Sequence, residues 1–422
     1  MKIAVVGAGI AGLTCAYMLC SKHKVYVFEK TNRPGGGIFS IKYKEGNIDN
    51  YVDLGFNIYN RAHYPNLVNL LDKFKLRSQE VPKSIIINHP NTKLYWCLGD
   101  NEQSYSSVMA YLKPINYKVF TLWRSWKKQW KDYLEKKDMK TPLSEYLKEE
   151  GISPEIQTKF VLPLIQSFWC GLRNNLNDMP AYFLFSYLSK IGLLEDHEDA
   201  RWRVVRGGGF RIVSQLVSSL INPIRFKTEV VKIFRRPEYV EITTHTGEKE
   251  TFDAVIIAIH ADEASKLLEK PTPSEEQILS SFGYEEFDVV VHTDERFIQT
   301  PSKEHASWYI QVSDTPEKIP PVITWDLNHL QQLAIKTKLF LTFASQGNNV
   351  PKEKTMTVLR RKAPKPTWKM LSVQKRFTEI NGVSRTYFCG DYWGYGTLED
   401  SLESALQIVP MIEKQQSRSQ TI

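Results

Sequence analysis

The sequence predicts an α/β fold in which a domain built on a parallel sheet is interrupted by a second, α+β domain. A short apolar run at residues 3–6 enters a glycine-rich turn and a helical stretch, and a second apolar run follows at residues 24–28. This order is typical of a βαβ unit with buried parallel strands. Short apolar runs of the same kind recur later in the chain, for example within residues 252–258. We therefore expect one domain from residues 1–80, 200–265 and 380–422 and a second from residues 81–199, mostly helical, and 266–379, which has strand-like runs.

Composition narrows the class of protein. The 422 residues are 42% hydrophobic and 24% charged, and the net charge of +8 is spread along the chain, so we expect no nucleic-acid partner. No uninterrupted apolar stretch reaches the roughly 18 residues of a spanning helix. The five cysteines are scattered and include no C-x-x-C pair, which argues against a disulfide framework or a metal site and favours the cytoplasm. These patterns leave contact with a membrane surface open.

The first glycine-rich turn carries the strongest chemical signal. It reads Gly7-x-Gly9-x-x-Gly12 and lies between a strand pattern and a helical stretch. In this context the first glycine permits a tight turn, the second lets the backbone approach a pyrophosphate, and the third allows close helix–strand packing. Glu29 ends the second strand, where its carboxylate can accept hydrogen bonds from ribose hydroxyls. The pattern predicts a bound adenine dinucleotide.

A second loop indicates which dinucleotide is bound. Residues 33–37 place Arg33 just before a run of three glycines. A second backbone loop and a cation beside the pyrophosphate suit a cofactor that is buried along its whole length, as FAD is. A reductase that also used a pyridine nucleotide would need a second G-x-G-x-x-G after a strand, and residues 207–209 do not fit that pattern. FAD is therefore the expected cofactor.

These motifs resemble the flavin-containing amine oxidoreductase superfamily of monoamine oxidases, protoporphyrinogen oxidase and phytoene desaturases. The resemblance also includes Asp53-x-Gly55 and residues 206–210, 388–391 and 398–402. It is closest to a bacterial subgroup of predicted NAD/FAD-binding proteins encoded beside cyclopropane-fatty-acid synthase, through residues such as 392–396. The resemblance implies a Rossmann-like FAD-binding domain with an inserted α+β substrate domain.

The resemblance also implies a set of site residues. FAD would be held by Gly7, Gly9, Ala11, Gly12, Glu29, Lys30, Arg33, Gly35, Gly36, Gly55, Phe56, Val230, Val231, Gly390, Asp391, Glu399, Asp400, Ser401 and Leu402. Tyr392, Trp393 and Tyr395 would form a wall on the substrate side, although aromatic packing gives the same pattern. His292 is a further catalytic candidate, because it ends a strand pattern in the substrate domain.

The substrate stays open at this level. The family chemistry is transfer of a hydride from a substrate C–H bond to the flavin N5, which oxidises a C–N or C–C bond, with oxygen or another electron acceptor completing the cycle. An amine, oxidised to an imine, would favour an aromatic cage. The alternative is a fatty acyl or isoprenoid chain, desaturated or isomerised with FAD, which would favour a long apolar tunnel. A flavin-binding protein without turnover is the alternative from another class, but the intact glycines and Arg33 speak against it.

An aromatic stripe bears on that choice. Phe120, Trp123, Trp126, Trp130 and Tyr133 recur at spacings of three and four with basic residues around them. One interpretation is an interfacial helix resting on anionic lipid. The other, which we favour, is a core helix of the substrate domain, because aromatic stripes usually pack inside.

Overall fold

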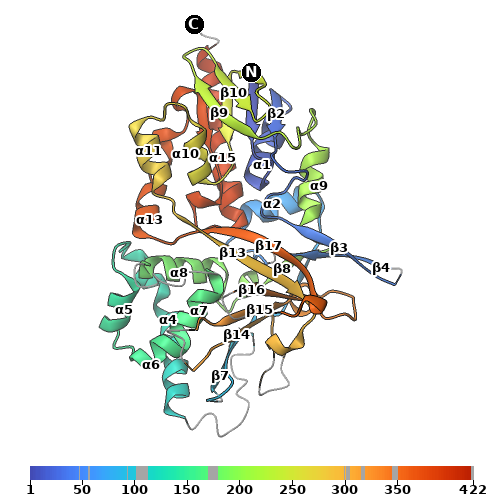
Figure 1. The fold of residues 1–422 in the computed structure, drawn as a ribbon. Coiled ribbons are helices and arrows are strands. Elements are labelled where there is room, and N and C mark those ends of the chain that lie inside the picture. Colours follow the sequence, from blue (N-terminus) through green and yellow to red (C-terminus); the bar gives the residue numbers. More distant parts are fainter. Residues whose placement is uncertain are drawn as a thin grey trace.

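The computed structural model describes residues 1–46, 48–55, 58–92, 94–100, 113–169, 179–298, 300, 305–314, 319–344 and 350–419. Figure 1 shows two parts, one above the other: the upper contains both chain termini, and the lower is built on a large sheet. Phe56 lies outside the described residues, so its expected place near the flavin stays a prediction.

The upper part is organised by a four-stranded parallel sheet in the order β18-β12-β1-β2. Its strands are β1 (Lys2–Val6), β2 (Lys24–Phe28), β12 (Ala254–Ile257) and β18 (Thr386–Phe388). The strands come from three distant stretches of the chain and are buried almost throughout, which explains their continuous apolar sequences. The carboxyl ends of β1 and β2 therefore meet at one edge of the sheet.

Helices and smaller sheets surround this sheet. Helix α1 (Ile10–Leu19) packs against α15 (Leu398–Ser419), and α2 (Pro65–Lys73) and α9 (Phe210–Ser218) lie beside them. Their shared core includes Leu13, Leu19, Ile256, Leu402 and Ile408. The remaining elements of the upper part are β9 (Val230–Arg235), β10 (Val240–Thr244), β11 (Lys249–Phe252), α10 (Ala261–Leu267) and α11 (Pro273–Ser280). β3 (Ser40–Glu45) pairs with β4 (Ile48–Asp53), and Val52 and Leu54 of this segment pack with residues of the large sheet described next. β5 (Ser78–Glu80) pairs with β8 (Arg203–Val205).

The lower part contains a seven-stranded sheet in the order β17-β13-β16-β15-β14-β6-β7. Its strands are β6 (Ser84–His89), β7 (Leu94–Gly99), β13 (Tyr284–His292), β14 (Trp308–Gln311), β15 (Val322–Asp326), β16 (Phe340–Ala344) and β17 (Thr355–Pro364). All pairs are antiparallel except β14 with β6. The described residues of 81–199 are mostly helical, as expected, but β6 and β7 are strands that the sequence did not predict. Every residue of both strands is buried, so they lack the alternation that marks a half-exposed strand.

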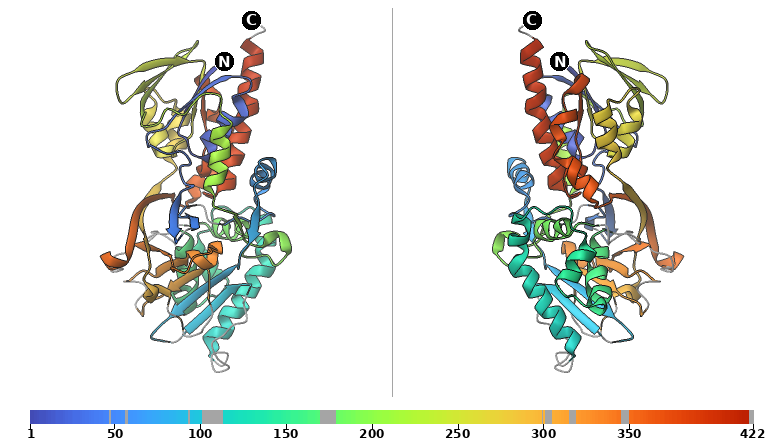
Figure 2. Two further views of the ribbon diagram at one scale, coloured as in Figure 1. Left: turned by 90° about the vertical axis from the view of Figure 1, so that its right-hand side faces the viewer. Right: turned by 90° about the vertical axis from the view of Figure 1, so that its left-hand side faces the viewer.

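Helices cover the large sheet. They are α4 (Pro114–Glu135), α5 (Leu143–Glu149), α6 (Pro154–Ile156), α7 (Leu162–Phe168), α8 (Ala181–Lys190) and α12 (Leu327–Gln331), and α13 (Trp368–Gln374) and α14 (Phe377–Ile380) lead back to the upper part. Both views of Figure 2 show α4 (cyan) alongside the blue strands β6 and β7. Among the described residues, no helix is both long enough and apolar enough to cross a bilayer.

The aromatic stripe of α4 packs into the core, as the favoured interpretation predicts. Trp123, Trp126 and Trp130 are all buried. The Trp126 ring lies 5.5 Å from the ring of Phe185 on α8 in an edge-to-face contact. The stripe therefore joins α4 to its neighbouring helices and is not presented to a membrane surface.

Candidate functional site

The three glycines of the first loop differ in what surrounds them. Gly7 has a positive φ of 103°, and a Cβ added there would lie 2.6 Å from the Ala258 carbonyl oxygen. A Cβ on Gly12 would lie 2.1 Å from the Gly7 carbonyl oxygen, so the helix packs too tightly for a side chain. Around Gly9, in contrast, no protein atom lies within 4 Å of an added Cβ. Gly7 and Gly12 thus shape the turn, and Gly9 faces open space at the start of α1.

The second glycine loop lies directly against the first. The Gly35 N–H donates to the Ala8 carbonyl oxygen at 2.8 Å, and a Cβ on Gly36 would lie 3.0 Å from the Gly9 Cα. Gly37 resembles Gly9 in that nothing lies within 4 Å of an added Cβ. Two loops separated in sequence therefore form one backbone cradle whose open side is lined by glycine.

Glu29 closes one end of this cradle. Its Oε2 accepts a hydrogen bond from the Ala8 N–H at 2.9 Å, and Oε1 accepts one from the Thr31 N–H at 2.8 Å. Its carbonyl oxygen accepts from the Thr228 N–H at 2.9 Å, which brings the start of β9 to the same edge. Each carboxylate oxygen keeps a further lone pair for ribose hydroxyls.

The other residues predicted to bind FAD near this end of the cradle differ in their exposure to solvent. Val230 is buried in β9, whereas Val231 is exposed on the opposite side of the strand. Lys30 is exposed and its Nζ pairs with the Glu263 carboxylate at 3.1 Å. Ala11 is buried inside α1. The loop, Glu29 and the beginning of β9 are therefore brought together, and the Lys30 ammonium is held by an acid at the surface.

Arg33 is half-buried beside the cradle. Its guanidinium carbon lies 4.2 Å from the centroid of the Phe39 ring, and Nη1 donates to the Gly36 carbonyl oxygen at 3.4 Å. Among the described residues, no carboxylate lies within ion-pair distance of this guanidinium. Burial lowers the pKa of Arg33, while Glu29 acts in the opposite direction. The arrangement keeps guanidinium donors beside the glycines for an anion.

The Asp53-x-Gly55 motif packs against the second glycine loop and the start of α9. Both carboxylate oxygens of Asp53 accept a hydrogen bond from the Gly209 N–H at 2.9 Å, which caps α9, and Ser40 Oγ donates to the same group. Burial raises the pKa of Asp53 to about 6 against the effect of these bonds. A Cβ on Gly55 would lie 1.9 Å from the Gly37 carbonyl oxygen. This motif therefore fixes the backbone beneath the second loop.

The acidic residues that begin α15 also have structural roles. Glu399 accepts hydrogen bonds from the backbone N–H groups of Asn66 at 2.8 Å and Leu67 at 3.0 Å, in the first turn of α2. Asp400 Oδ2 accepts bonds from the N–H groups of Tyr395 at 2.9 Å and Thr397 at 2.8 Å. These carboxylates orient the first turn of α15, and Ser401 and Leu402 are buried behind it.

Gly390 and Asp391 occupy the turn that follows β18. The Gly390 N–H donates to Ser404 Oγ at 3.0 Å, and the carbonyl oxygen of Asp391 accepts from the Gly394 N–H at 3.0 Å. Burial raises the pKa of the Asp391 carboxyl, and the charge of Asp400 acts in the same direction. The turn thus connects the parallel sheet to the residues around a pocket.

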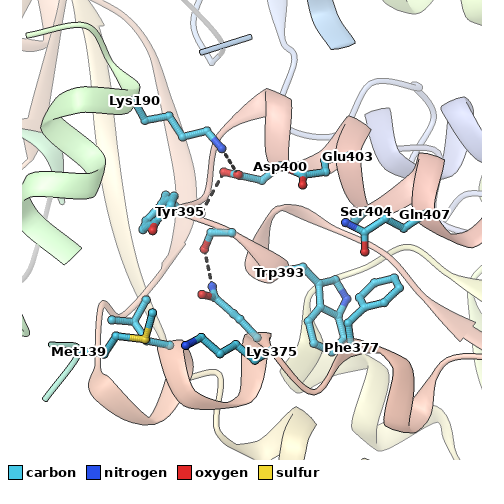
Figure 3. Close-up of a pocket in the computed structure, with 13 residues that line it drawn as sticks. Met139, Lys190, Lys375, Phe377, Trp393, Tyr395, Asp400, Glu403, Ser404 and Gln407 are labelled. Carbon is cyan, nitrogen blue, oxygen red and sulfur yellow. Dashed lines mark hydrogen bonds and ion pairs between the residues drawn. The ribbon is translucent and has the colours of Figure 1, made fainter. Parts of the chain in front are cut away.

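That pocket has a volume of about 320 Å³ and lies between α13, α15 and the end of α8. Figure 3 shows its lining. Trp393, Tyr395 and Asp400 are among the residues that line it, together with Lys190. Lys190 forms a buried ion pair with Asp400, and its Nζ lies 5.5 Å from the centroid of the Tyr395 ring. Residues of the two glycine loops do not line this pocket.

The three aromatic candidates do not share one environment. Tyr392 is fully buried, and its ring packs 4.9 Å from that of Phe282. Trp393 donates from Nε1 to the Phe388 carbonyl oxygen at 3.0 Å, which fixes the indole. Only Trp393 and Tyr395 reach the pocket. Tyr392 therefore packs in the core behind them.

A scan against family models decides the classification. Residues 10–335 match the family described as flavin containing amine oxidoreductase. The chain belongs to this family. It is 29% identical over 289 residues to the L-amino-acid oxidase of Mus musculus, covering 62% of this chain and 41% of that protein. The chain thus spans less than half of that relative's length.

Solved structures support the fold of this amine oxidoreductase family member. A CLA-producing fatty acid isomerase from P. acnes superimposes with a TM-score of 0.66 at 13% identity, covering 97% of this chain and 98% of the other. Cyclohexylamine oxidase from Brevibacterium oxydans IH-35A gives 0.67 at 14% identity, covering 98% and 99%. At such identities the likeness establishes the fold.

FAD, the cofactor of this family, fits the residues of the cradle. Glycines 9 and 37 leave room for a ligand at the backbone, and no side chain caps the first turn of α1. The N–H groups of that turn and the Arg33 guanidinium can bind phosphate oxygens, and Glu29 can bind a ribose. Donors, acceptor and open space therefore coincide at one edge of the parallel sheet.

His292 is placed away from the pocket lining. It is fully buried; Nε2 lies 2.7 Å from Thr342 Oγ1, and Nδ1 accepts from the Asp294 N–H at 3.0 Å. Burial lowers the pKa of His292 to about 4, so the ring is neutral at pH 7. The His292 side chain therefore packs and forms hydrogen bonds inside the large sheet.

Lys190 and a series of packed rings behind Tyr395 were not predictable from the sequence. Trp325 stacks on Trp308 at 5.3 Å, Trp308 contacts Phe168 at 5.4 Å, and Phe183 lies 5.3 Å from Tyr395. These rings come from distant segments, so no local spacing marks them. The aromatic content of the lower part was the only available signal.

Proposed function

We propose that this family member is an FAD-dependent oxidoreductase whose substrate is a small amine. The observation that carries the cofactor assignment is the backbone cradle, open at Gly9 and Gly37 and closed by Glu29. When bound, FAD accepts a hydride equivalent from a substrate carbon. The chain would bind the pyrophosphate through the start of α1 and Arg33, and the ribose through Glu29.

The pocket supports a small substrate. Its volume of about 320 Å³ is at the lower end of the range for small-molecule sites. Trp393 and Tyr395 would orient the substrate, and the Lys190–Asp400 pair would hold the wall that carries Tyr395. We infer that oxygen or another acceptor completes the cycle in a reducing compartment such as the cytoplasm, because the four described cysteines form no disulfide.

Two observations make an acyl chain a less favoured substrate than an amine. The stripe of α4, which would have suited contact with lipid, is buried among α-helices. The pocket also has polar groups at its wall, including Gln374 and Glu403, where an acyl chain would need apolar surface. The likeness to a fatty acid isomerase concerns the fold. Because of it, fatty acids are included in the experiment that tests the proposal.

Anaerobic reduction separates these proposals. The FAD-loaded protein is mixed, without oxygen, with a panel of primary and secondary amines and with a panel of unsaturated fatty acids. Bleaching of the visible flavin band by an amine supports the proposal. Bleaching by fatty acids alone, or conversion of a fatty acid to an isomer without bleaching, overturns the amine assignment. Neither bleaching nor isomerisation with either panel favours a flavin-binding protein without turnover.

A further inference from the structure

A second arginine lies close to the cradle and comes from the lower sheet. Arg361 is on β17, the edge strand of the seven-stranded sheet, which Figure 1 shows at the boundary with the upper part. Its Nη2 donates to the Leu54 carbonyl oxygen at 3.1 Å, in the segment between β4 and Gly55. It also lies 3.4 Å from the position of a Cβ added to Gly55. The Arg361 side chain thus connects the edge strand of the large sheet to the segment that precedes Gly55.

Arg361 and Arg33 form a pair of like charges. Their guanidinium carbons lie 5.9 Å and 4.2 Å from the centroid of the same ring, Phe39. In the described part of the chain, neither guanidinium has a carboxylate within 4.0 Å; the hydrogen bonds that the structure gives them go to the carbonyl oxygens of Leu54 and Gly36. Burial lowers the pKa of Arg361, and the charge of Arg33 lowers it further.

This arrangement is unfavourable for the protein alone. Two half-buried cations near one another repel, and carbonyl oxygens neutralise neither. By contrast, the neighbouring arginine on β17, Arg360, is exposed and pairs with Glu286 at 3.0 Å. A dianion between Arg33 and Arg361 would compensate both charges and use guanidinium donors that the described residues leave without an acceptor.

The cradle is where such a dianion would lie. Gly55 separates Arg361 from Gly37, because a Cβ on Gly55 would meet the Gly37 carbonyl oxygen and the Arg361 guanidinium at once. Arg33 contacts the same loop through the Gly36 carbonyl oxygen, and no protein atom lies within 4 Å of a Cβ added to Gly37. A pyrophosphate carries one negative charge on each phosphate, which matches two guanidiniums.

We propose that Arg361 is a cofactor-binding residue that, with Arg33, holds the pyrophosphate of FAD from the substrate-domain side. This proposal rests on the proposed function and extends it, because it makes the edge strand of the lower sheet part of the cofactor site. Binding of the cofactor would then also tie the two parts of the molecule together.

Ligand binding by Arg361→Gln tests the proposal, with Arg360→Gln as the matched control on the exposed side of β17. Affinities of the apoproteins for FAD, ADP and riboflavin are measured by calorimetry. We expect Arg361→Gln to weaken FAD and ADP by about 10- to 100-fold and to leave riboflavin, which has no phosphate, unchanged. Arg361→Lys should fall in between, and Arg360→Gln should match the wild type.

The thermal midpoint of each apoprotein separates binding from folding. Relief of the repulsion with Arg33 should leave the apo midpoint of Arg361→Gln unchanged or raised, whereas a purely structural arginine would lower it. Unchanged FAD and ADP affinity in Arg361→Gln, or a loss for riboflavin equal to that for ADP, would overturn this proposal alone. A wild-type protein that binds no FAD would overturn the proposed function as well.

Discussion

The carboxylate of Glu29 accepts a hydrogen bond from the backbone N–H of Ala8 at 2.9 Å, which ties the end of β2 to the first glycine loop. This contact spans the βαβ unit and aligns the acid with the open side of the cradle. The βαβ unit therefore fixes both the backbone of the first glycine loop and the position of the Glu29 carboxylate.

Replacement of Trp126 by alanine should destabilise the fold strongly. The indole is 1% exposed, and its removal leaves a cavity among α4 and α8, so we expect a loss of about 3–5 kcal/mol in the free energy of unfolding. Tyr117→Ala, at an exposed position of the same helix, is the control and should change little. Urea unfolding measures both. Unchanged stability together with lost binding to anionic vesicles would restore the interfacial interpretation of α4.

The buried pair of Lys190 and Asp400 should contribute to stability because Asp400 is almost inaccessible to solvent. Lys190→Met leaves the carboxylate without its cation and should cost about 3 kcal/mol in urea unfolding. Lys22→Met, which breaks an exposed pair with Glu413, is the control and should barely move the midpoint. The double variant Lys190→Met with Asp400→Asn should recover most of the loss. Equal, small effects at both lysines would contradict a buried role.

Asp53 should make stability depend on pH in a defined direction. Its pKa is about 6 in the folded protein and 3.8 in the reference state, so the folded protein binds the proton more tightly. The contribution of this group to stability is therefore greatest below pH 4 and falls as the pH rises to about 6.

Asp53→Asn removes this titration and keeps an acceptor for the Gly209 N–H. The free energy of unfolding of the variant, minus that of the wild type, should rise between pH 4.5 and 7, by at most about 3 kcal/mol. Chemical denaturation at several pH values measures the difference. A difference that stays constant, or that falls with increasing pH, would show that the buried carboxyl does not titrate in this way.

Local sequence chemistry predicted part of this site well. The strand, glycine turn and helix at residues 3–22 were predictable because strand burial, glycine conformation and helix packing are all set within one short segment. The packed stripe of α4 was also predictable from its spacing. In contrast, β6 and β7 are buried on both faces, so their sequences carry no period that separates strand from helix.

Long-range contacts account for what the sequence could not indicate. Glu399 caps a helix that begins more than 300 residues earlier, and Asp53 caps one more than 150 residues later. Arg361 lies beside Leu54 only because the two parts of the chain fold against each other. Such partners are chosen by tertiary packing, and residue type and spacing alone do not reveal them.

The most direct test of the account is the FAD content of the purified wild-type protein and of Gly9→Ala. A Cβ at Gly9 meets no protein atom, so the variant should fold with an unchanged apo thermal midpoint while its methyl group blocks the pyrophosphate. Gly283→Ala, at an exposed glycine, is the control. We predict a yellow wild type and control with one FAD per chain, and a Gly9→Ala protein whose FAD affinity falls at least about tenfold. Full FAD occupancy in Gly9→Ala, or a wild type that cannot be loaded with FAD, would contradict the account.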